Sequence, residues 1–293
     1  MDILVVSPHD LVLKSPMGKT MEGWSTIHLE QQSYWRGMEL DRKRLGLSLG
    51  GGAVRGWAHI GVLSVLLQSQ IPIDFVSGSS AGSLVGAIYC SGCNLGKLLQ
   101  IAASLKWWHI ARPVWPAHGL ISFARLEKWL IQMIGDLTFE QLQVPFAAMT
   151  TDLISGEPVP ILSGRLAPAV RASCSVPGLV TPVNIDGRLL GDGSISDTVP
   201  VRILRDMGAD IVIAVDIFAP NIRPRLGAFG MGLNALEILV QNAGGGIKHA
   251  DFLISPDLAG NTYLRFSRRE QLYLLGEKAA REKLPDILSS LEG

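Results

Sequence analysis

The sequence predicts a three-layer α/β/α domain with a mostly parallel central sheet. From residue 45 onwards, short apolar runs alternate with segments whose apolar residues recur about every 3.6 positions, an order typical of parallel strands joined by crossover helices. The apolar runs, such as IVIAVDI at 211–217, are continuous and do not alternate with polar residues. Such runs indicate strands that helices cover on both faces, which gives the three layers.

Residues 1–44 show no sustained period, and we expect them to form an extension of unknown role before one domain over 45–293. In the first half of that domain, short apolar runs next to glycine, proline or aspartate predict strands, and segments of helical period predict helices. Ser122 is expected to cap the last of these helices. The expected order is strand 45–49, helix 57–68, strand 73–78, helix 83–90, helix 96–106 and helix 122–134.

The second half of the domain continues the alternation. The run PFAAMTTDL predicts a strand, and GEPVPI after it is expected to be the hairpin partner. Gly208 is expected to close one short helix, because glycine is common directly after a helix end. The expected order is strand 145–153, strand 156–161, helix 166–173, strand 188–194, helix 200–208, strand 211–217, strand 252–256 and an amphipathic helix 268–291.

The composition limits the class of protein. Among 293 residues, 26 Lys and Arg balance 26 Asp and Glu, and 47% of the residues are hydrophobic. A nucleic-acid-binding protein needs a basic excess and a disordered chain needs low hydrophobicity, so both classes are excluded. The 32 glycines among 293 residues make up about 11% of the chain, above the usual share of about 7%. This excess predicts many tight turns or close backbone contacts.

Cysteine usage and hydropathy bear on the compartment. The chain has three cysteines, no signal-peptide pattern, and no stretch of 18 residues that is free of charge, proline or glycine breaks. We therefore expect a cytoplasmic protein, with the inner face of the membrane as the place of any peripheral contact. Cys90 and Cys93 form a C-x-x-C pattern, but they follow a predicted helix instead of opening one, which disfavours a redox site.

Residues 78–82, GSSAG, match the G-x-S-x-G pattern of a nucleophile elbow, with Ser80 at the centre. A serine on a sharp turn from strand to helix needs small neighbours, and Gly78 and Gly82 provide the space. The unpaired N–H groups at the helix start would favour a developing negative charge. The strand before and the helix after support a nucleophile, although the five residues alone also fit an ordinary glycine-rich turn.

Residues 50–56, GGGAVRG, form a second loop between a strand and a helix. The glycine spacing does not fit a dinucleotide-binding fingerprint, and no P-loop lysine follows. We therefore favour an oxyanion hole built from backbone N–H groups. Arg55 either orients an anionic substrate head group or forms a structural salt bridge. The residues assigned to this loop are Gly50, Gly51, Gly52, Ala53, Arg55 and Gly56.

A serine nucleophile needs a nearby base. Asp192 lies between Gly191 and Gly193 at the carboxyl end of a predicted strand, where α/β sheets bind ligands. Burial there would raise the pKa of its carboxyl group and allow it to act as the base. The alternative is His249, which alone gives the chain order Ser, Asp, His of the α/β-hydrolases. His59 is expected to pack or to form a hydrogen bond.

The motifs GGGAVRGWAHIGVL, GSSAGS and GDGS, in this order, resemble the patatin-like phospholipases, especially the bacterial patatin-like esterases. TTDLISGEPV, RASCSVPGLVTPV and GADIVIAVDI add to the resemblance, which covers about residues 45–293. It implies a patatin-like fold and hydrolysis of lipid esters without a histidine, a metal or a cofactor. It also implies a catalytic dyad of Ser80 and Asp192, an oxyanion loop at Gly50–Ala53, and support of the elbow and the dyad loop by Gly78, Gly82 and Gly193.

Two residues depart from the usual family pattern. Ala53 stands where a fourth glycine is common, and we expect its N–H to remain a donor as long as φ stays negative. Ser194 follows the Asp-Gly pair where glycine or alanine is usual. We expect both departures to affect rate or selectivity more than the chemistry.

The segment LKWWHIARPVWPAHGL at 105–120 contains three of the seven tryptophans, Trp107, Trp108 and Trp115. Tryptophan suits a surface that is apolar on one side and wet on the other, so the segment is either a flap that contacts lipid or ordinary packing over the sheet. Candidate contacts to anionic head groups are Lys106, Arg112 and NIRPR at 221–225.

We therefore expect a serine hydrolase of the phospholipase, lysophospholipase or esterase type, acting on a lipid or another acyl ester. The alternatives are an esterase with a triad that includes His249 and a non-catalytic lipid-binding or adaptor protein on the same scaffold. Acyl length, head group and oligomeric state are left open.

Overall fold

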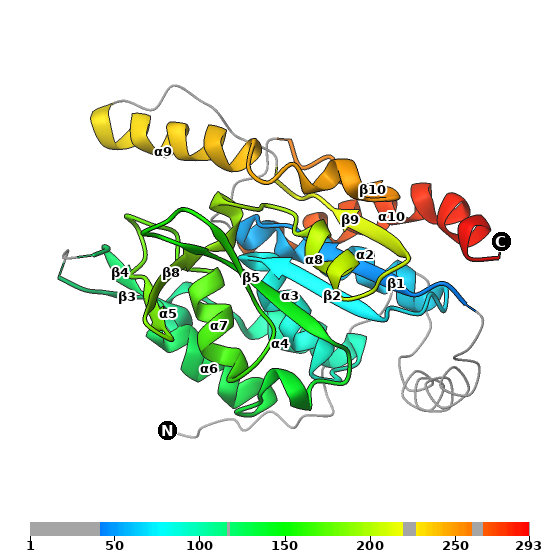
Figure 1. Cartoon of the computed structure of the whole chain (residues 1–293), viewed down its shortest axis with the longest axis horizontal. Coiled ribbons are helices and arrows are strands. Elements are labelled where there is room, and N and C mark those ends of the chain that lie inside the picture. Colours follow the sequence, from blue (N-terminus) through cyan, green and yellow to red (C-terminus); the bar gives the residue numbers. More distant parts are fainter. Residues whose placement is uncertain (1–41, 116–117, 219–226, 260–265, 293) are drawn as a thin grey trace, which may run out of the picture. The chain divides into compact units, whose positions relative to one another are not determined.

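A mixed eight-stranded sheet forms the centre of the unit over Lys43–Gly293 (Figure 1). The computed structural model describes residues 42–115, 118–218, 227–259 and 266–292, so the expected extension 1–44 lies almost wholly outside the described residues. The strands of the sheet are β1 (Leu45–Leu49), β2 (Phe75–Ser79), β5 (Phe146–Asp152), β6 (Pro158–Ile161), β7 (Val183–Ile185), β8 (Arg188–Asp192), β9 (Ile211–Val215) and β10 (Phe252–Ile254).

The sheet is mostly parallel, as the sequence predicts. Its strands lie in the order β10-β9-β1-β2-β5-β8-β7, with β6 paired to β5. The five strands from β10 to β5 are parallel, whereas β6, β7 and β8 pair in antiparallel fashion. The β5–β6 hairpin that the sequence predicts is present.

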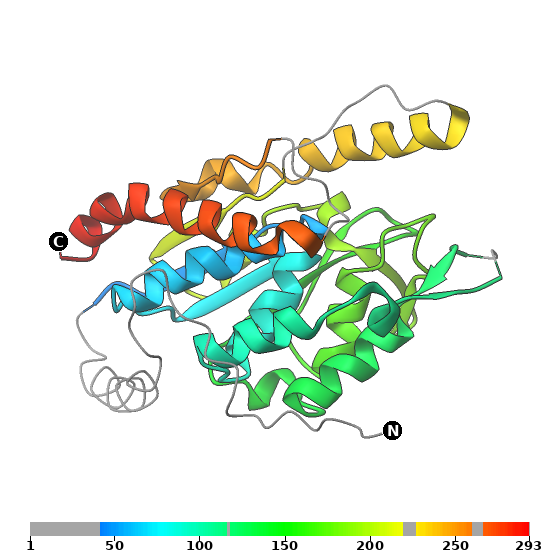
Figure 2. The same cartoon turned by 180° about the vertical axis from the view of Figure 1, so that it is seen from behind.

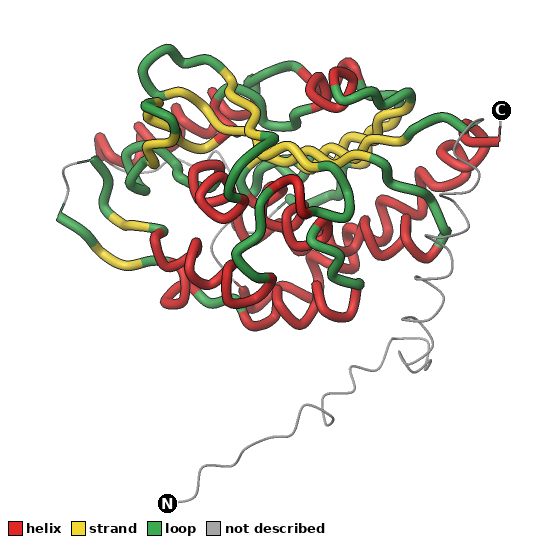
Figure 3. The backbone as a smooth tube through the Cα atoms, turned by 60° about the horizontal axis from the view of Figure 1, so that its bottom comes forward, coloured by secondary structure: helices red, strands yellow, loops and turns green. Residues whose placement is uncertain are grey.

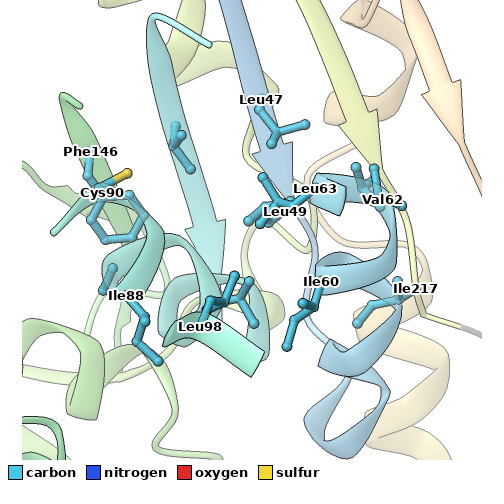
Figure 4. Close-up of a cluster of buried hydrophobic side chains, with 14 of the residues drawn as sticks. Leu47, Leu49, Ile60, Val62, Leu63, Ile88, Cys90, Leu98, Phe146 and Ile217 are labelled. Carbon is cyan, nitrogen blue, oxygen red and sulfur yellow. The ribbon is translucent and has the colours of Figure 1, made fainter. Parts of the chain in front are cut away.

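Helices cover both faces of the sheet, which confirms the three-layer class (Figure 3). Alternate residues of a strand point to opposite faces. Leu47 and Leu49 of β1 pack in the large apolar cluster with Ile60 and Leu63 (Figure 4), whereas Val212 of β9 packs in a smaller cluster on the other face. The main helices are α2 (Trp57–Gln68), α3 (Ala81–Cys90), α4 (Leu95–Ser104), α6 (Ala124–Ile134), α7 (Leu166–Ser173), α8 (Val201–Asp206), α9 (Gly227–Gln241) and α10 (Arg269–Glu292).

The longest helix, α10, crosses α2 at close range (Figure 2). A Cβ atom added to Gly61 would lie 2.1 Å from the carbonyl oxygen of Tyr273, and one added to Gly276 would lie 2.1 Å from that of Ala58. The two backbones therefore touch where a side chain has no room. Within the described ranges, none of the helices combines the length and the apolar character that a membrane span requires.

Several expected elements differ in detail. Strand 45–49 and helix 57–68 have the expected bounds, but α6 begins at Ala124, with Phe123 as its N-cap. Ser122 is therefore not the cap, because it pairs with Arg112 in a short hairpin formed by β3 (Arg112–Pro113) and β4 (Ile121–Ser122). This hairpin, the one-turn helix α5 (Trp107–Ile110), β7 and α9 are absent from the expected order.

The register of the sheet brings the candidate site residues to one edge. In the parallel pair β1 and β2, Leu49 lies opposite Gly78, so the glycine loop and Ser80 leave the sheet side by side. In the next pair Ser79 lies opposite Met149 of β5, and the following residue of β5, Thr150, lies opposite Asp192 of β8. The topology thus places Asp192 next to the turn that carries Ser80.

Candidate active site

The turn at Ser80 is a sharp connection between β2 and α3, as the G-x-S-x-G pattern predicts. Ser80 has φ 51° and ψ −117°, a conformation that non-glycine residues rarely adopt. A Cβ atom on Gly78 would lie 2.5 Å from the backbone of Gly82, and one on Gly82 would lie 2.0 Å from the carbonyl oxygen of Leu49. Both glycines are therefore required by space, which confirms the expected context of the turn.

The Ser80 and Asp192 side chains meet. Ser80 Oγ donates a hydrogen bond of 2.7 Å to Asp192 Oδ2, and the backbone N–H of Ser194 donates one of 2.9 Å to Asp192 Oδ1. Asp192 is 2% exposed, whereas Ser80 is partly exposed. The carboxylate is thus held on both oxygens, and the serine hydroxyl points at one of them.

Burial raises the pKa of Asp192 from 3.8 to about 6, while the hydrogen bonds from the Ser80 hydroxyl and the Ser194 amide lower it. The Ser194 hydroxyl also lies near enough to lower this pKa, although its geometry is not that of a hydrogen bond. A carboxylate with this pKa is ionised at neutral pH and is a much better base than an exposed aspartate.

The first two N–H groups of the glycine loop are hydrogen-bonded to backbone carbonyl groups of the fold. This reduces the number of donors that the expected oxyanion loop can offer. The N–H of Gly50 donates to Val215 O (3.0 Å) and the N–H of Gly51 donates to Thr198 O (3.2 Å). Within the described residues, the N–H groups of Gly52 and Ala53 have no such partner. Of the four residues Gly50–Ala53, only the last two therefore offer free donors.

The expectation of a negative φ at Ala53 is wrong, although its N–H still has no hydrogen-bond partner among the described residues. Its φ is +50°, so the loop needs a left-handed residue at this position. An alanine there costs on the order of 1 kcal/mol compared with glycine. Ala53 also begins a 3-10 turn, Ala53–Gly56, in which Gly56 packs against Ala81 at the start of α3. The loop thus lies directly beside the elbow.

Arg55 and His59 have structural positions. The Arg55 side chain is 1% exposed, which favours the structural alternative over contact with a head group from solvent. His59 Nε2 lies 2.7 Å from the carbonyl oxygen of Gly50, and burial lowers the pKa of His59 to about 4. The ring is therefore neutral, donates to Gly50 and fixes the start of the glycine loop, as expected.

His249 lies near the amino ends of the parallel strands, whereas Ser80 lies at their carboxyl ends. Its carbonyl oxygen accepts from Arg205, and the same guanidinium donates to Asp210 O, directly before β9. Ser80 follows the carboxyl end of β2, which runs parallel to β9 on the other side of β1. The triad alternative is therefore wrong in geometry. None of the described histidines forms a hydrogen bond with Ser80 or Asp192.

The end of α7 holds both Ser80 and Asp192, an arrangement that the sequence pattern does not predict. Ser80 N donates to Ser173 Oγ (2.9 Å), and the Cys174 thiol, whose pKa burial raises, donates to Ser80 O (3.3 Å). Asp192 N donates to Ser175 O (2.8 Å). The signal was present in the motif RASCSVPG, where small polar residues end a predicted helix.

Two further features concern cofactors and redox chemistry. All three cysteines are free, and Cys90 ends α3 while Cys93 follows in the next turn, so the pair does not open a helix. In the described part of the chain, no cluster of three His, Cys, Asp or Glu residues has the geometry for a metal ion.

Comparison with known proteins places the chain in a family. The profile of the family described as patatin-like phospholipase matches residues 47–205, more than half of the chain. An uncharacterized NTE family protein of Mycobacterium tuberculosis is 38% identical over 184 residues, which cover 62% of this chain and 51% of that protein. The chain thus spans about half the length of its mycobacterial relatives.

Other matches agree with this result. The neuropathy target esterase of Drosophila melanogaster is 34% identical over 59% of this chain and 13% of its own length, and the lysophospholipase nte1 of Aspergillus fumigatus is 32% identical over 60% and 12%. The crystal structure of VipD from Legionella pneumophila shares the fold, with a TM-score of 0.59 and 12% identity, over 84% of this chain and 67% of that one. With its profile match over residues 47–205, this chain belongs to the patatin-like phospholipase family.

Proposed function

We propose that the chain hydrolyses carboxyl esters of lipids with Ser80 as nucleophile and Asp192 as base. The observation that carries this proposal is the 2.7 Å hydrogen bond from Ser80 Oγ to a buried carboxylate whose pKa is raised to about 6. A serine hydroxyl becomes a nucleophile when a base takes its proton during the attack.

The proposed reaction has two steps. Ser80 Oγ bonds to the ester carbonyl carbon while its proton passes to Asp192, and the free amides of Gly52, Ala53 and the helix start at Ala81 face the negative oxygen. The intermediate expels the alcohol, which takes the proton from Asp192, and leaves an acyl-serine. Asp192 then takes a proton from water while the hydroxide adds to the acyl carbon. The second intermediate releases the carboxylic acid, and Asp192 returns the proton to Ser80 Oγ.

The names of the relatives suggest the substrate class. One relative is an esterase and another a lysophospholipase, so we infer that a lysophospholipid or a related lipid ester is the substrate. Such substrates reside in membranes or micelles, and we infer peripheral contact of the chain with a lipid surface. The alternative of a non-catalytic adaptor has no supporting observation in the geometry of the site.

A fluorophosphonate probe tests the proposal, because it reacts only with an activated serine. We expect labelling of Ser80 in the wild-type chain, no labelling of Ser80→Ala, and full labelling of the control Ser91→Ala at the far end of α3. Release of fatty acid from lysophosphatidylcholine should follow the same pattern. A folded protein with no labelling and no hydrolysis of any lipid ester would support the adaptor instead.

The pH dependence of kcat/KM should report Asp192. Because the base must be ionised, we expect activity to fall as the pH drops through about 6. Ser194→Ala removes a hydroxyl that lowers the pKa of Asp192, so its acid limb should move to higher pH by up to about one unit. Hydrolysis rates on a short-chain ester between pH 4.5 and 8.5 measure the acid limb of the wild type and that of Ser194→Ala. An unchanged limb in Ser194→Ala would show that this hydroxyl does not act on the base.

A further inference from the structure

Two elements beyond the dyad extend past the carboxyl ends of the parallel strands. One is the hairpin of β3 and β4 with α5 before it, and the other is α9. Figures 1 and 2 show both elements on the same end of the unit, away from the end of α10. Both carry exposed apolar side chains.

The hairpin and the preceding helix α5 expose large aromatic surface. Trp115 is 90% exposed and Trp108 is 64% exposed, and Leu120 on the other arm is also exposed. Trp107 instead packs against the core and anchors the segment. Tryptophan rings are enriched at membrane interfaces, because the ring is apolar and its N–H reaches polar groups. Exposed tryptophans on a protruding hairpin are therefore typical of a lipid contact.

The same segment is positively charged although the whole chain is neutral. Between residues 106 and 128 the only acidic residue is Glu127, and it pairs with Arg171 at 3.1 Å. A groove of about 420 Å³ beside α6 is lined in part by His109, Arg125 and Lys128, and Lys106 Nζ lies 5.2 Å from the centre of the Trp108 ring. The exposed cations are Lys106, Arg112, Arg125 and Lys128.

Helix α9 presents an apolar stripe to solvent. Met231, Ile238 and Leu239 are exposed at a spacing of seven and eight residues, which places them on one face of the helix. Asn234 points inward and is buried, and Glu237, also partly buried, is the only charged residue in 227–241. The apolar face therefore points outward, the reverse of an ordinary surface helix.

Both elements are fixed to segments that carry the dyad. Leu120 N and Ile121 N donate to Leu179 O, a few residues after Ser173 and Cys174, which hold Ser80. On the other side, the Thr198 hydroxyl lies within hydrogen-bond distance of Val240 O of α9 and of Ser194 O, two residues after Asp192, and its one proton is shared between them. A lipid surface that contacts both elements would thus lie at the end of the molecule that contains the site.

We propose that residues 106–115 and 118–128, together with the apolar stripe of α9, dock on the surface of an anionic phospholipid bilayer. The tryptophans and the α9 stripe enter the interface, and the four cations contact lipid phosphates. Charge complementarity decides the occupant, because a positive segment with apolar tips fits an anionic lipid surface better than a neutral one. This proposal rests on the proposed function, because docking would bring the site to a lipid substrate. Docking itself can be measured without turnover.

Vesicle flotation tests the docking with Ser80→Ala protein, which removes hydrolysis. We expect the chain to float with vesicles of phosphatidylcholine and phosphatidylglycerol, to bind phosphatidylcholine alone more weakly, and to lose binding at high salt. Trp115→Ala and Leu239→Ser should weaken partition by about tenfold each. Lys128→Glu should weaken it by about fivefold or more on anionic vesicles and have little effect on neutral ones.

Matched controls lie on α10, whose carboxyl-terminal end is at the other end of the unit (Figure 1). Leu288→Ser and Lys283→Glu, both exposed, should leave partition unchanged. Equal effects of surface and control variants, or no flotation at all, would overturn the proposal. A dimer in sedimentation that Leu239→Ser dissociates, without vesicle binding, would assign the surface to self-association instead.

The failure of this proposal is separate from the failure of the proposed function. The surface variants should hydrolyse a short, soluble ester at the wild-type rate, because they leave the dyad intact. If the soluble ester is cleaved and no variant changes flotation, only the docking is wrong. If no ester is cleaved but flotation follows the expected pattern, only the hydrolase is wrong.

Discussion

Ser80→Ala and Asp192→Asn should each lower kcat/KM for a short-chain nitrophenyl ester by about four orders of magnitude. Ser80→Ala removes the oxygen atom that forms the acyl-enzyme in the proposed mechanism. Asp192→Asn keeps the shape of the side chain but removes the proposed base, whose Oδ2 lies 2.7 Å from Ser80 Oγ. The double variant should be no worse than either single one, because the two groups act in the same step.

The Asp192→Asn variant should also be at least as stable as the wild type at pH 7.5. The pKa of Asp192 is about 6 in the folded chain and 3.8 in its ordinary state, so between these values the folded chain binds more protons than the unfolded one. The stability from this group is complete below about pH 4 and is lost as the pH rises to about 6. At pH 7.5 the buried charge therefore costs up to about 3 kcal/mol, which asparagine avoids.

Asp197→Asn is the matched control for this experiment. Asp197 is a second buried aspartate close in sequence, and burial raises its pKa to about 7 against the opposing effect of Arg202. Its backbone carbonyl oxygen accepts from Ser79 Oγ, but among the described residues its carboxylate forms no hydrogen bond with Ser80. We expect this variant to retain activity within about tenfold. Undiminished turnover in Asp192→Asn, or equal loss in Asp197→Asn, would contradict the role of the dyad.

The strands and helices near the site can be predicted from local sequence patterns. The same patterns single out Ser80 and Asp192 as candidate site residues. Continuous apolar runs and glycine turns are local signals, and they predict β1 and α2 to the residue. The direction of each amide is not local. Gly50 N donates to Val215, which is 165 positions later in the chain, so residue type alone cannot separate the scaffold amides from the free ones. The same holds for Ser173, which reaches Ser80 across 93 positions.

The missed helix α9 has a physical reason as well. A helix is recognised from sequence when its apolar residues share a face that packs on the core. In α9 an apolar stripe faces solvent while Asn234 is buried, and glycines at its start lower the helix propensity. The hairpin of β3 and β4 has only two residues in each strand, too few to show a period. Both elements belong to the surface that we propose for lipid docking.

The second large effect should come from Gly82→Ala at the elbow. In a helix, replacing glycine with alanine ordinarily stabilises by up to about 1 kcal/mol. At Gly82 the new Cβ atom would lie 2.0 Å from Leu49 O and 2.8 Å from Gly50 O, and these are backbone atoms at the end of a buried strand. The strand and helix must separate to admit the methyl group. We expect a loss of about 3 kcal/mol or more, and a fall in Tm of about 10 °C.

Gly232→Ala in α9 is the control that separates space from helix propensity. Gly232 is also helical, but no atom lies within 4 Å of the position its Cβ would take. The same substitution should therefore leave Tm unchanged or raise it slightly, and should leave hydrolysis of a soluble ester unchanged. Thermal unfolding of the two variants at one pH measures the difference. Equal shifts in Tm would mean that the elbow can relax around a side chain, and that Gly82 is not required by the close contact between β1 and α3.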